Sequence, residues 1–224
     1  MTAIFLTATG TDIGKTFVAV GLIRALRRRG HAVAALKPVA SGFEEWSAPA
    51  SDPARLLAAL DLPATAAAMA HIAPFRFRAP LAPDMAAARE GRALEFDALI
   101  AFCRQEIAAR SDVLLIEGIG GVMVPLDDRH TVLDWMGELD LPALLVAGSY
   151  LGTISHTLTA LAALRQRAIA VRAIVVSETD GSSVPLDDTA ASIARFAGDI
   201  PVVALPLLAP GADDAAFDRL VLLL

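Results

Sequence analysis

The residues with the clearest chemical potential form the segment Thr9-Gly10-Thr11-Asp12-Ile13-Gly14-Lys15-Thr16. It follows an apolar run at residues 3–6 and precedes a predicted helix. In such a loop, backbone N–H groups and the helix N-terminus face phosphate oxygens, a lysine adds a mobile charge, and a threonine hydroxyl reaches Mg²⁺. Thr9 stands where the usual pattern has glycine, but its neighbours Ala8 and Gly10 keep the turn small. We therefore predict a phosphate-binding loop.

Polar residues also follow two other predicted strands. Lys37 comes directly after the apolar run at 32–36, and Glu117 comes after the run at 113–116. Phosphoryl transfer needs positioning, a metal ion on phosphate oxygens, and cations that face the developing charge. We expect Lys15 and Lys37 to approach the γ-phosphate from two sides. The oxygen ligands of Mg²⁺ are expected to come from Thr16, Asp52 and Glu117.

The elements that must position these residues alternate between short apolar runs and longer helical patterns. This alternation predicts an α/β fold: one doubly wound, mostly parallel sheet with helices on both faces, in a single domain over residues 1–224. The predicted strands cover residues 3–6, 32–36, 113–116, 143–147, 171–176 and 202–205. The predicted helices cover residues 16–29, 52–60, 94–110, 131–138, 153–167, 189–197 and 213–223. Residues 62–92 contain several prolines and no firm period, so we expect an irregular connection there.

Composition restricts the partners of the chain. With 224 residues, 55% of them hydrophobic, a net charge of −6 and no basic cluster, it is not expected to bind nucleic acid. Cys103, the single cysteine, is predicted to lie in a helix core. Residues 141–164 lack charge, but Pro142 and Gly148 interrupt them, so we predict a strand, a loop and a helix rather than a membrane span. We expect a cytoplasmic protein that does not bind membranes.

Taken together, these motifs resemble the dethiobiotin synthetase family of P-loop proteins. The resemblance runs from end to end and includes Lys37-Pro38-Val39-Ala40-Ser41-Gly42, Glu117-Gly118-Ile119-Gly120-Gly121 and Leu151-Gly152-Thr153-Ile154-Ser155-His156. It implies a cyclo-ligase that forms C–N bonds late in biotin synthesis. Such an enzyme uses MgATP and CO₂ to close a cyclic urea on 7,8-diaminopelargonic acid, through a carbamate and a carbamic–phosphoric anhydride, and releases ADP and phosphate.

The resemblance also implies roles for individual residues. Lys37 would neutralise the carbamate and the phosphoryl group, Lys15 and Thr11 would hold the γ-phosphate, Ser41 would bind the carbamate, and Asp12 would orient the substrate amines. The implied nucleotide contacts are Asp12, Ile13, Gly14, Lys15, Thr16, Phe17, Asp52, Glu117, Gly118, Ile119, Gly120, Ser177, Glu178, Pro206, Leu207 and Leu208.

A second loop is implied to bind the carboxylate tail of the substrate across the interface of a homodimer. It contains Gly152, Thr153, Ile154 and Ser155, and it opens a predicted helix whose free N–H groups suit a carboxylate. Thr153 acting as a simple helix N-cap is the alternative interpretation, and both can hold at once.

Three positions depart from the family pattern. Ala8 stands where the family usually has glycine, and Gly10 is available nearby. Ser177 stands where the family often has an asparagine that contacts adenine, and a serine hydroxyl cannot make that bidentate contact. We therefore expect backbone groups at Pro206, Leu207 and Leu208 to contribute more to base selection. Ser155 replaces a common asparagine in the tail-binding loop, where backbone donors are expected to remain.

Two other functions use the same loop. One is a P-loop amidoligase or kinase with a different acid substrate. Only its dependence on the substrate would distinguish it from a dethiobiotin synthetase. The other is a nucleotide-switch ATPase of the partitioning or metal-insertion type. Those switches often carry an extra lysine near the start of the loop, where this chain has Ala8, Thr9 and Gly10.

Overall fold

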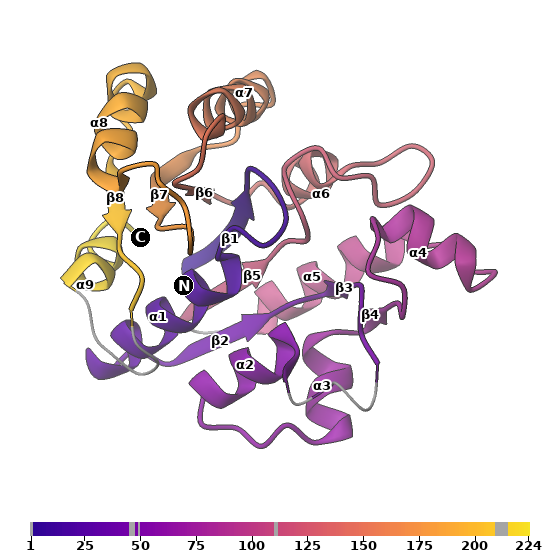
Figure 1. The fold of residues 1–224 in the computed structure, drawn as a ribbon. Coiled ribbons are helices and arrows are strands. Elements are labelled where there is room, and N and C mark those ends of the chain that lie inside the picture. Colours follow the sequence, from indigo (N-terminus) through magenta and orange to yellow (C-terminus); the bar gives the residue numbers. More distant parts are fainter. Residues whose placement is uncertain (1, 45–47, 49, 110–111, 209–214) are drawn as a thin grey trace.

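A computed structural model describes residues 2–44, 48, 50–109, 112–208 and 215–224. Six parallel strands form its central sheet in the order β2-β5-β1-β6-β7-β8 (Figure 1). The strands are β1 (Thr2–Ala8), β2 (Val33–Leu36), β5 (Val113–Glu117), β6 (Ala143–Gly148), β7 (Val171–Ser177) and β8 (Val202–Leu205). Each of the six runs predicted from the sequence is a strand of this sheet, so the predicted parallel α/β architecture is confirmed.

Helices cover both faces of the sheet. They are α1 (Lys15–Arg28), α2 (Asp52–Ala59), α3 (Ala66–Ile72), α4 (Pro83–Arg89), α5 (Phe96–Ala109), α6 (Val132–Leu139), α7 (Thr153–Gln166), α8 (Leu186–Ala197) and α9 (Ala215–Val221). Helix α1 packs on β1, β2 and β5 beside α2 and α9, whereas α7 and α8 pack on β6, β7 and β8. Figure 1 shows these two groups on opposite sides of the sheet. Right-handed crossovers that leave β1 in one direction and β6 in the other require this arrangement.

Strand β1 lies at the centre of the sheet and pairs with β5 on one side and β6 on the other. Its residues Ile4, Phe5 and Leu6 are fully buried, and the ring of Phe5 meets the ring of Trp135 from α6 edge-on, with 4.8 Å between centroids. Burial on both faces explains why these strands are nearly continuous apolar runs. The carboxyl ends of β1, β2 and β5 therefore form a fixed edge from which the following loops emerge.

The prediction of an irregular connection over residues 62–92 is wrong. The segment contains α3, α4 and the short strand β4 (Phe75–Arg76), which pairs in parallel with β3 (Val39–Ala40). Thr65 caps α3 by accepting a hydrogen bond from the N–H of Ala68. Pro83 begins α4, where the N–H that proline lacks would have no intrahelical partner. The prolines thus mark where elements begin and do not indicate a lack of structure.

The remaining differences are small. Helix α8 begins at Leu186, three residues before the predicted start, because Pro185 acts as its N-cap residue. Two predicted helices extend beyond the described residues: position 110 of the helix predicted over 94–110, and positions 213–214 of the helix predicted over 213–223. Cys103 is fully buried on α5, as predicted, and residues 141–164 are β6, a loop and part of α7. In the part of the chain that the structure describes, no helix is both long and apolar enough to cross a membrane.

Candidate functional site

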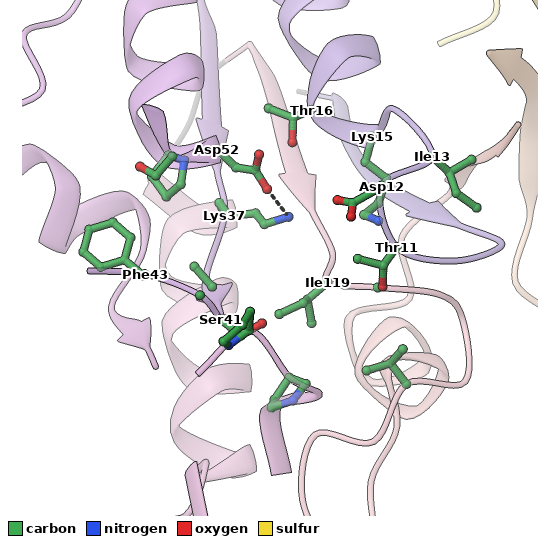
Figure 2. A pocket seen from close by; sticks show the side chains of 18 of the residues that line it. Thr11, Asp12, Ile13, Lys15, Thr16, Lys37, Ser41, Phe43, Asp52 and Ile119 are labelled. Atoms are coloured by element: carbon green, nitrogen blue, oxygen red, sulfur yellow. Dashed lines mark ion pairs between the residues drawn. The ribbon is translucent and has the colours of Figure 1, made fainter. Parts of the chain in front are cut away.

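A cavity of about 720 Å³ opens at the carboxyl edge of the sheet, and we call it the main cavity. Figure 2 shows the side chains around it, with the phosphate loop on one side and the residues that follow β2 on the other. It brings together twelve of the residues predicted from the sequence. They are Thr11, Asp12, Ile13, Gly14, Lys15, Thr16, Phe17, Lys37, Ser41, Asp52, Ile119 and Gly120.

The phosphate loop joins the end of β1 to the start of α1. Its backbone takes left-handed conformations at Asp12, with φ of 56°, and at Gly14, with φ of 95°. Gly14 is the N-cap residue of α1, and a Cβ at this position would lie 2.9 Å from the hydroxyl of Ser177. The first N–H groups of α1 have no partner within the helix, so they are available to an anion at this end of the cavity.

Lys15 is the first residue of α1. Its Nζ donates a hydrogen bond to the carbonyl oxygen of Gly10 at 3.0 Å, which folds the side chain back over the phosphate loop. Burial, followed by the positive charge of Lys37, lowers the pKa of Lys15 from its ordinary 10.5 to about 8. The lysine therefore lies in a position where an added anion would strongly favour its charged form.

Lys37 follows β2 and is 4% exposed. Its Nζ lies 2.6 Å from Oε1 of Glu117, 2.9 Å from the carbonyl oxygen of Gly118 and 3.3 Å from Oδ2 of Asp52. Burial alone would lower its pKa, but the two carboxylates outweigh burial and the pKa of Lys37 is raised. Lys15 and Lys37 are the two lysines of the chain, and both line the main cavity.

The residues predicted to hold Mg²⁺ are also neighbours. The hydroxyl of Thr16 donates to Oε1 of Glu117 at 2.7 Å, and the charge of Lys37 lowers the pKa of Asp52 against the opposing effect of burial. The second carboxylate oxygen of Glu117, Oε2, is buried and has no hydrogen-bond partner among the described residues.

This donor set fits Mg²⁺, which prefers oxygen ligands and usually takes one or two carboxylates. Among the described residues, no group of three or more His, Cys, Asp or Glu side chains could hold a metal ion by itself. A metal ion at Thr16, Asp52 and Glu117 would therefore complete its coordination with phosphate oxygens and water.

Residues that the sequence did not single out complete the cavity wall. They include Phe43, Arg55, Pro80 and Pro83. Arg55 lies one turn after Asp52 on α2, and its charge also lowers the pKa of Asp52. Pro80 packs against Gly42, which brings the segment before α4 next to the loop after β2. The alanine-rich pattern with a proline at the start of α4 was the signal that could have revealed this wall.

The loop predicted to bind the substrate tail does not line the main cavity. It joins β6 to α7, and Leu151 at its tip is 92% exposed. Gly152 is the N-cap residue of α7, with φ of 97°, so the alternative interpretation of Thr153 as the N-cap is wrong. The Thr153 hydroxyl donates instead to the carbonyl of Gly148 at 2.7 Å and ties the loop to β6. Ile154 and Ser155 follow in the first turn of α7.

The residues predicted to contact the base also lie outside the lining of the main cavity. Ser177 is buried beneath Gly14 at the end of β7. Glu178 accepts a hydrogen bond from the N–H of Leu207 at 2.8 Å, so this backbone donor is already used within the protein. Pro206 and Leu208 flank Leu207 after β8 and are half-buried. Gly118 and Glu117 are not among the lining residues, and the carbonyl of Gly118 accepts a hydrogen bond from Lys37.

Comparisons with known proteins agree with this geometry. Residues 2–209 match a protein-family model described as an AAA domain. The chain is 53% identical over 203 residues to the ATP-dependent dethiobiotin synthetase BioD of Methylobacterium nodulans, covering 88% of this chain and 90% of that protein. It is 48% identical over 202 residues to the protein of the same name from Acidiphilium cryptum, covering 90% of this chain and 91% of that protein.

Solved structures support the fold. The septum site-determining protein MinD of Pyrococcus horikoshii, complexed with Mg-ADP, is similar with a TM-score of 0.51 and 17% sequence identity, over 91% of this chain and 81% of that one. The cell division ATPase MinD of Pyrococcus furiosus is similar with a TM-score of 0.51 and 16% identity, over 92% and 83% of the two chains. At these identities the likeness shows the fold alone.

Proposed function

This chain belongs to the family of ATP-dependent dethiobiotin synthetases, ligases of biotin biosynthesis that use ATP, and we propose that its main cavity joins CO₂ to 7,8-diaminopelargonic acid. The observation that carries the proposal is the convergence of both lysines on one cavity with a phosphate loop. The relatives favour this ligase over the amidoligase, kinase and nucleotide-switch alternatives, since each of them is named a dethiobiotin synthetase. We place the reaction in the cytoplasm.

The first step needs no protein nucleophile. One amine of the substrate attacks CO₂ and loses a proton, which gives a carbamate anion. This anion must then approach the γ-phosphate of ATP, which is also negative, so the two repel each other. Lys37 and Lys15 counter that repulsion from opposite sides, and Thr11 and the first N–H groups of α1 hold the phosphate oxygens.

The second and third steps depend on orientation. An oxygen of the carbamate attacks the γ-phosphorus, the bond to ADP breaks, and a carbamic–phosphoric anhydride forms. The second amine then attacks the carbonyl carbon and loses a proton, the bond to phosphate breaks, phosphate leaves, and the five-membered urea closes. Ser41 on the wall opposite the phosphate loop is placed to donate to the carbamate, and Asp12 is placed to orient the amines.

Mg²⁺ bound by Thr16, Asp52 and Glu117 would neutralise charge on the ATP phosphates. The nucleotide contacts proposed from the sequence are kept, with two adjustments. Ser177 supports the phosphate loop through Gly14. Base selection falls to groups other than the N–H of Leu207, which Glu178 already occupies.

The carboxylate tail of the substrate is proposed to bind at Gly152, Thr153, Ile154 and Ser155 of a second copy of the chain. This loop is exposed at the start of α7 and does not reach the main cavity of its own chain. A homodimer that places one copy's loop against the other copy's cavity would complete the site. The free N–H groups of Ile154 and Ser155 suit the carboxylate.

The test is ADP release by purified protein supplied with MgATP and bicarbonate, with and without 7,8-diaminopelargonic acid. Release should depend on the diamine, and dethiobiotin should form in equal amount. Lys37→Ala should lower the rate by about 100-fold or more, because it removes a cation that faces the reacting anions. Arg172→Ala removes a positive charge at the exposed start of β7 and serves as the control. Release that ignores the diamine would contradict the proposal.

A further inference from the structure

The ammonium of Lys37 has no donor left for a substrate. A lysine carries three N–H donors, and here three protein oxygens surround Nζ: Oε1 of Glu117 at 2.6 Å, the carbonyl of Gly118 at 2.9 Å and Oδ2 of Asp52 at 3.3 Å. Lys15 differs, because among the described residues its ammonium donates only to the carbonyl oxygen of Gly10. Lys37 must therefore break at least one of these contacts before it can donate to a phosphate or a carbamate.

The oxygens that hold Lys37 are those that suit a metal ion. Oε1 of Glu117 accepts a hydrogen bond from Nζ of Lys37 and another from the hydroxyl of Thr16 at 2.7 Å. Asp52 also lies beside Lys37 and Thr16. A Mg²⁺ ion binds oxygen at about 2.0–2.1 Å. An ion on the same carboxylate oxygen would lie within a few ångströms of the ammonium, and two cations that close repel strongly in a buried site. The present position of Lys37 therefore opposes binding of a metal ion at Oε1 of Glu117, and an ion on the unpartnered Oε2 would still lie close to the ammonium.

We propose that Lys37 is the resident cation of the metal site in the nucleotide-free enzyme, and that a metal ion, whether it binds alone or with the nucleotide, displaces its ammonium into the main cavity. This inference rests on the proposed function for the identity of the metal site. The displaced ammonium moves from Glu117 toward Ser41 and the γ-phosphate, where the carbamate forms. The ammonium of Lys37, which attracts the carbamate, therefore reaches this position only after the metal ion has bound.

The exchange also explains how the buried carboxylate of Glu117 is tolerated in the empty enzyme, beside the partly exposed Asp52. Glu117 is 1% exposed, and a buried carboxylate without a partner is strongly destabilising. Lys37 neutralises this charge in the empty enzyme, and the metal ion would do so in the loaded one. The three ligating groups therefore stay preformed in both states.

The first experiment measures binding of Mn²⁺ alone, by its electron paramagnetic resonance signal, to nucleotide-free protein. Lys37→Met keeps the aliphatic stem and removes the ammonium, so it should bind Mn²⁺ at least about tenfold more tightly than the unaltered protein. Lys15→Met is the matched control, because it removes the same charge from the same cavity without freeing Glu117. Its effect should be less than about threefold.

Two results would overturn the proposal. One is a Lys37→Met affinity no greater than that of Lys15→Met. The other is a gain that persists when Glu117→Gln is added to Lys37→Met, because the Mn²⁺ would then be bound elsewhere. The Mn²⁺ measurement uses neither the diamine nor ATP, so a failure of the synthetase reaction would leave this result standing.

A second measurement needs no variant. Since the chain has two lysines, reductive methylation followed by mass spectrometry reports each ammonium separately. Mn²⁺ titrated to saturation of the nucleotide-free protein should raise the labelling of Lys37 by about tenfold as it leaves its buried position, with no rise at Lys15. Labelling of Lys37 that stays unchanged at saturating Mn²⁺ would contradict the displacement.

Discussion

Lys15 and Lys37 carry the same charge into the same cavity, but their surroundings have opposite effects. Lys37 contacts two carboxylates, which raise its pKa despite its burial. Lys15 has no carboxylate within hydrogen-bond distance among the described residues, so burial and the charge of Lys37 lower its pKa to about 8. The two lysines should therefore be distinguishable by experiment before any nucleotide is added.

We predict that Lys15 reacts with an acylating reagent with a midpoint near pH 8 in nucleotide-free, metal-free protein, while Lys37 remains protected. Below pH 8 both the folded and the unfolded chain hold the Lys15 proton. Between pH 8 and 10.5 the folded chain releases this proton first, so the contribution of Lys15 to stability rises with pH in this window. Mass spectrometry of the labelled peptides measures the midpoint, with Nα-acetyl-lysine as the control. A midpoint near 10.5 would contradict this assignment.

Among the elements, α1 has the most varied contacts. Lys15 and Thr16 in its first turn line the main cavity, and its buried face packs on β1, β2 and β5. Further along, Gly21 faces α9, where a Cβ would lie 2.0 Å from the ring of Phe217. The glycine is thus required for close approach of the two helices, although glycine is a poor helix former.

A pair of matched substitutions tests this packing. Gly21→Ala should lower the free energy of unfolding by about 1–3 kcal/mol, because overpacking against Phe217 exceeds the gain in helix propensity. Gly137→Ala on α6 has open space around it and should raise the free energy of unfolding by up to about 1 kcal/mol. Urea unfolding followed by circular dichroism measures both. If the two variants shift in the same direction, the close contact between α1 and α9 is not present in solution.

At the scale of the whole molecule, the main cavity and the exposed loop before α7 are separate in one chain. Figure 1 shows α7 and α2 on opposite sides of the sheet, and no residue of the loop before α7 lines the main cavity of its own chain. The proposed homodimer would unite these two parts. Leu151, which is 92% exposed at the tip of the loop, is the residue best placed to report on it.

Leu151→Asp should convert a dimer to a monomer and abolish diamine-dependent ADP release, because a charge would replace an apolar contact. Nucleotide binding should persist, since the phosphate loop and both lysines belong to one chain. Leu62→Asp introduces the same charge at a half-exposed leucine after α2 and is the control. Analytical ultracentrifugation gives the oligomeric state. A monomeric unaltered protein, or a dimeric Leu151→Asp variant, would contradict the composite site.

Much of this architecture is encoded locally. The apolar runs that became β1, β2, β5, β6, β7 and β8 could be predicted because strands buried on both faces must be apolar throughout. The phosphate loop could be predicted from the residue types that a phosphate requires. Lys37 and Glu117 were singled out because the carboxyl ends of parallel strands meet at one edge. The single domain over residues 1–224 and the individual site roles remain predictions.

The sequence by itself thus determined the sheet, the loop and the residues able to perform phosphoryl transfer. Only the tertiary structure decided how these residues pair. The contact of Lys37 with Glu117 joins positions 80 residues apart, and the placement of Ser177 beneath Gly14 joins β7 to the phosphate loop. Helix α4 and its place in the cavity wall also depended on long-range packing, because a short alanine-rich segment is stabilised mainly by what it packs against. Local patterns specify which groups are available, and only the folded chain determines which of them already neutralise one another.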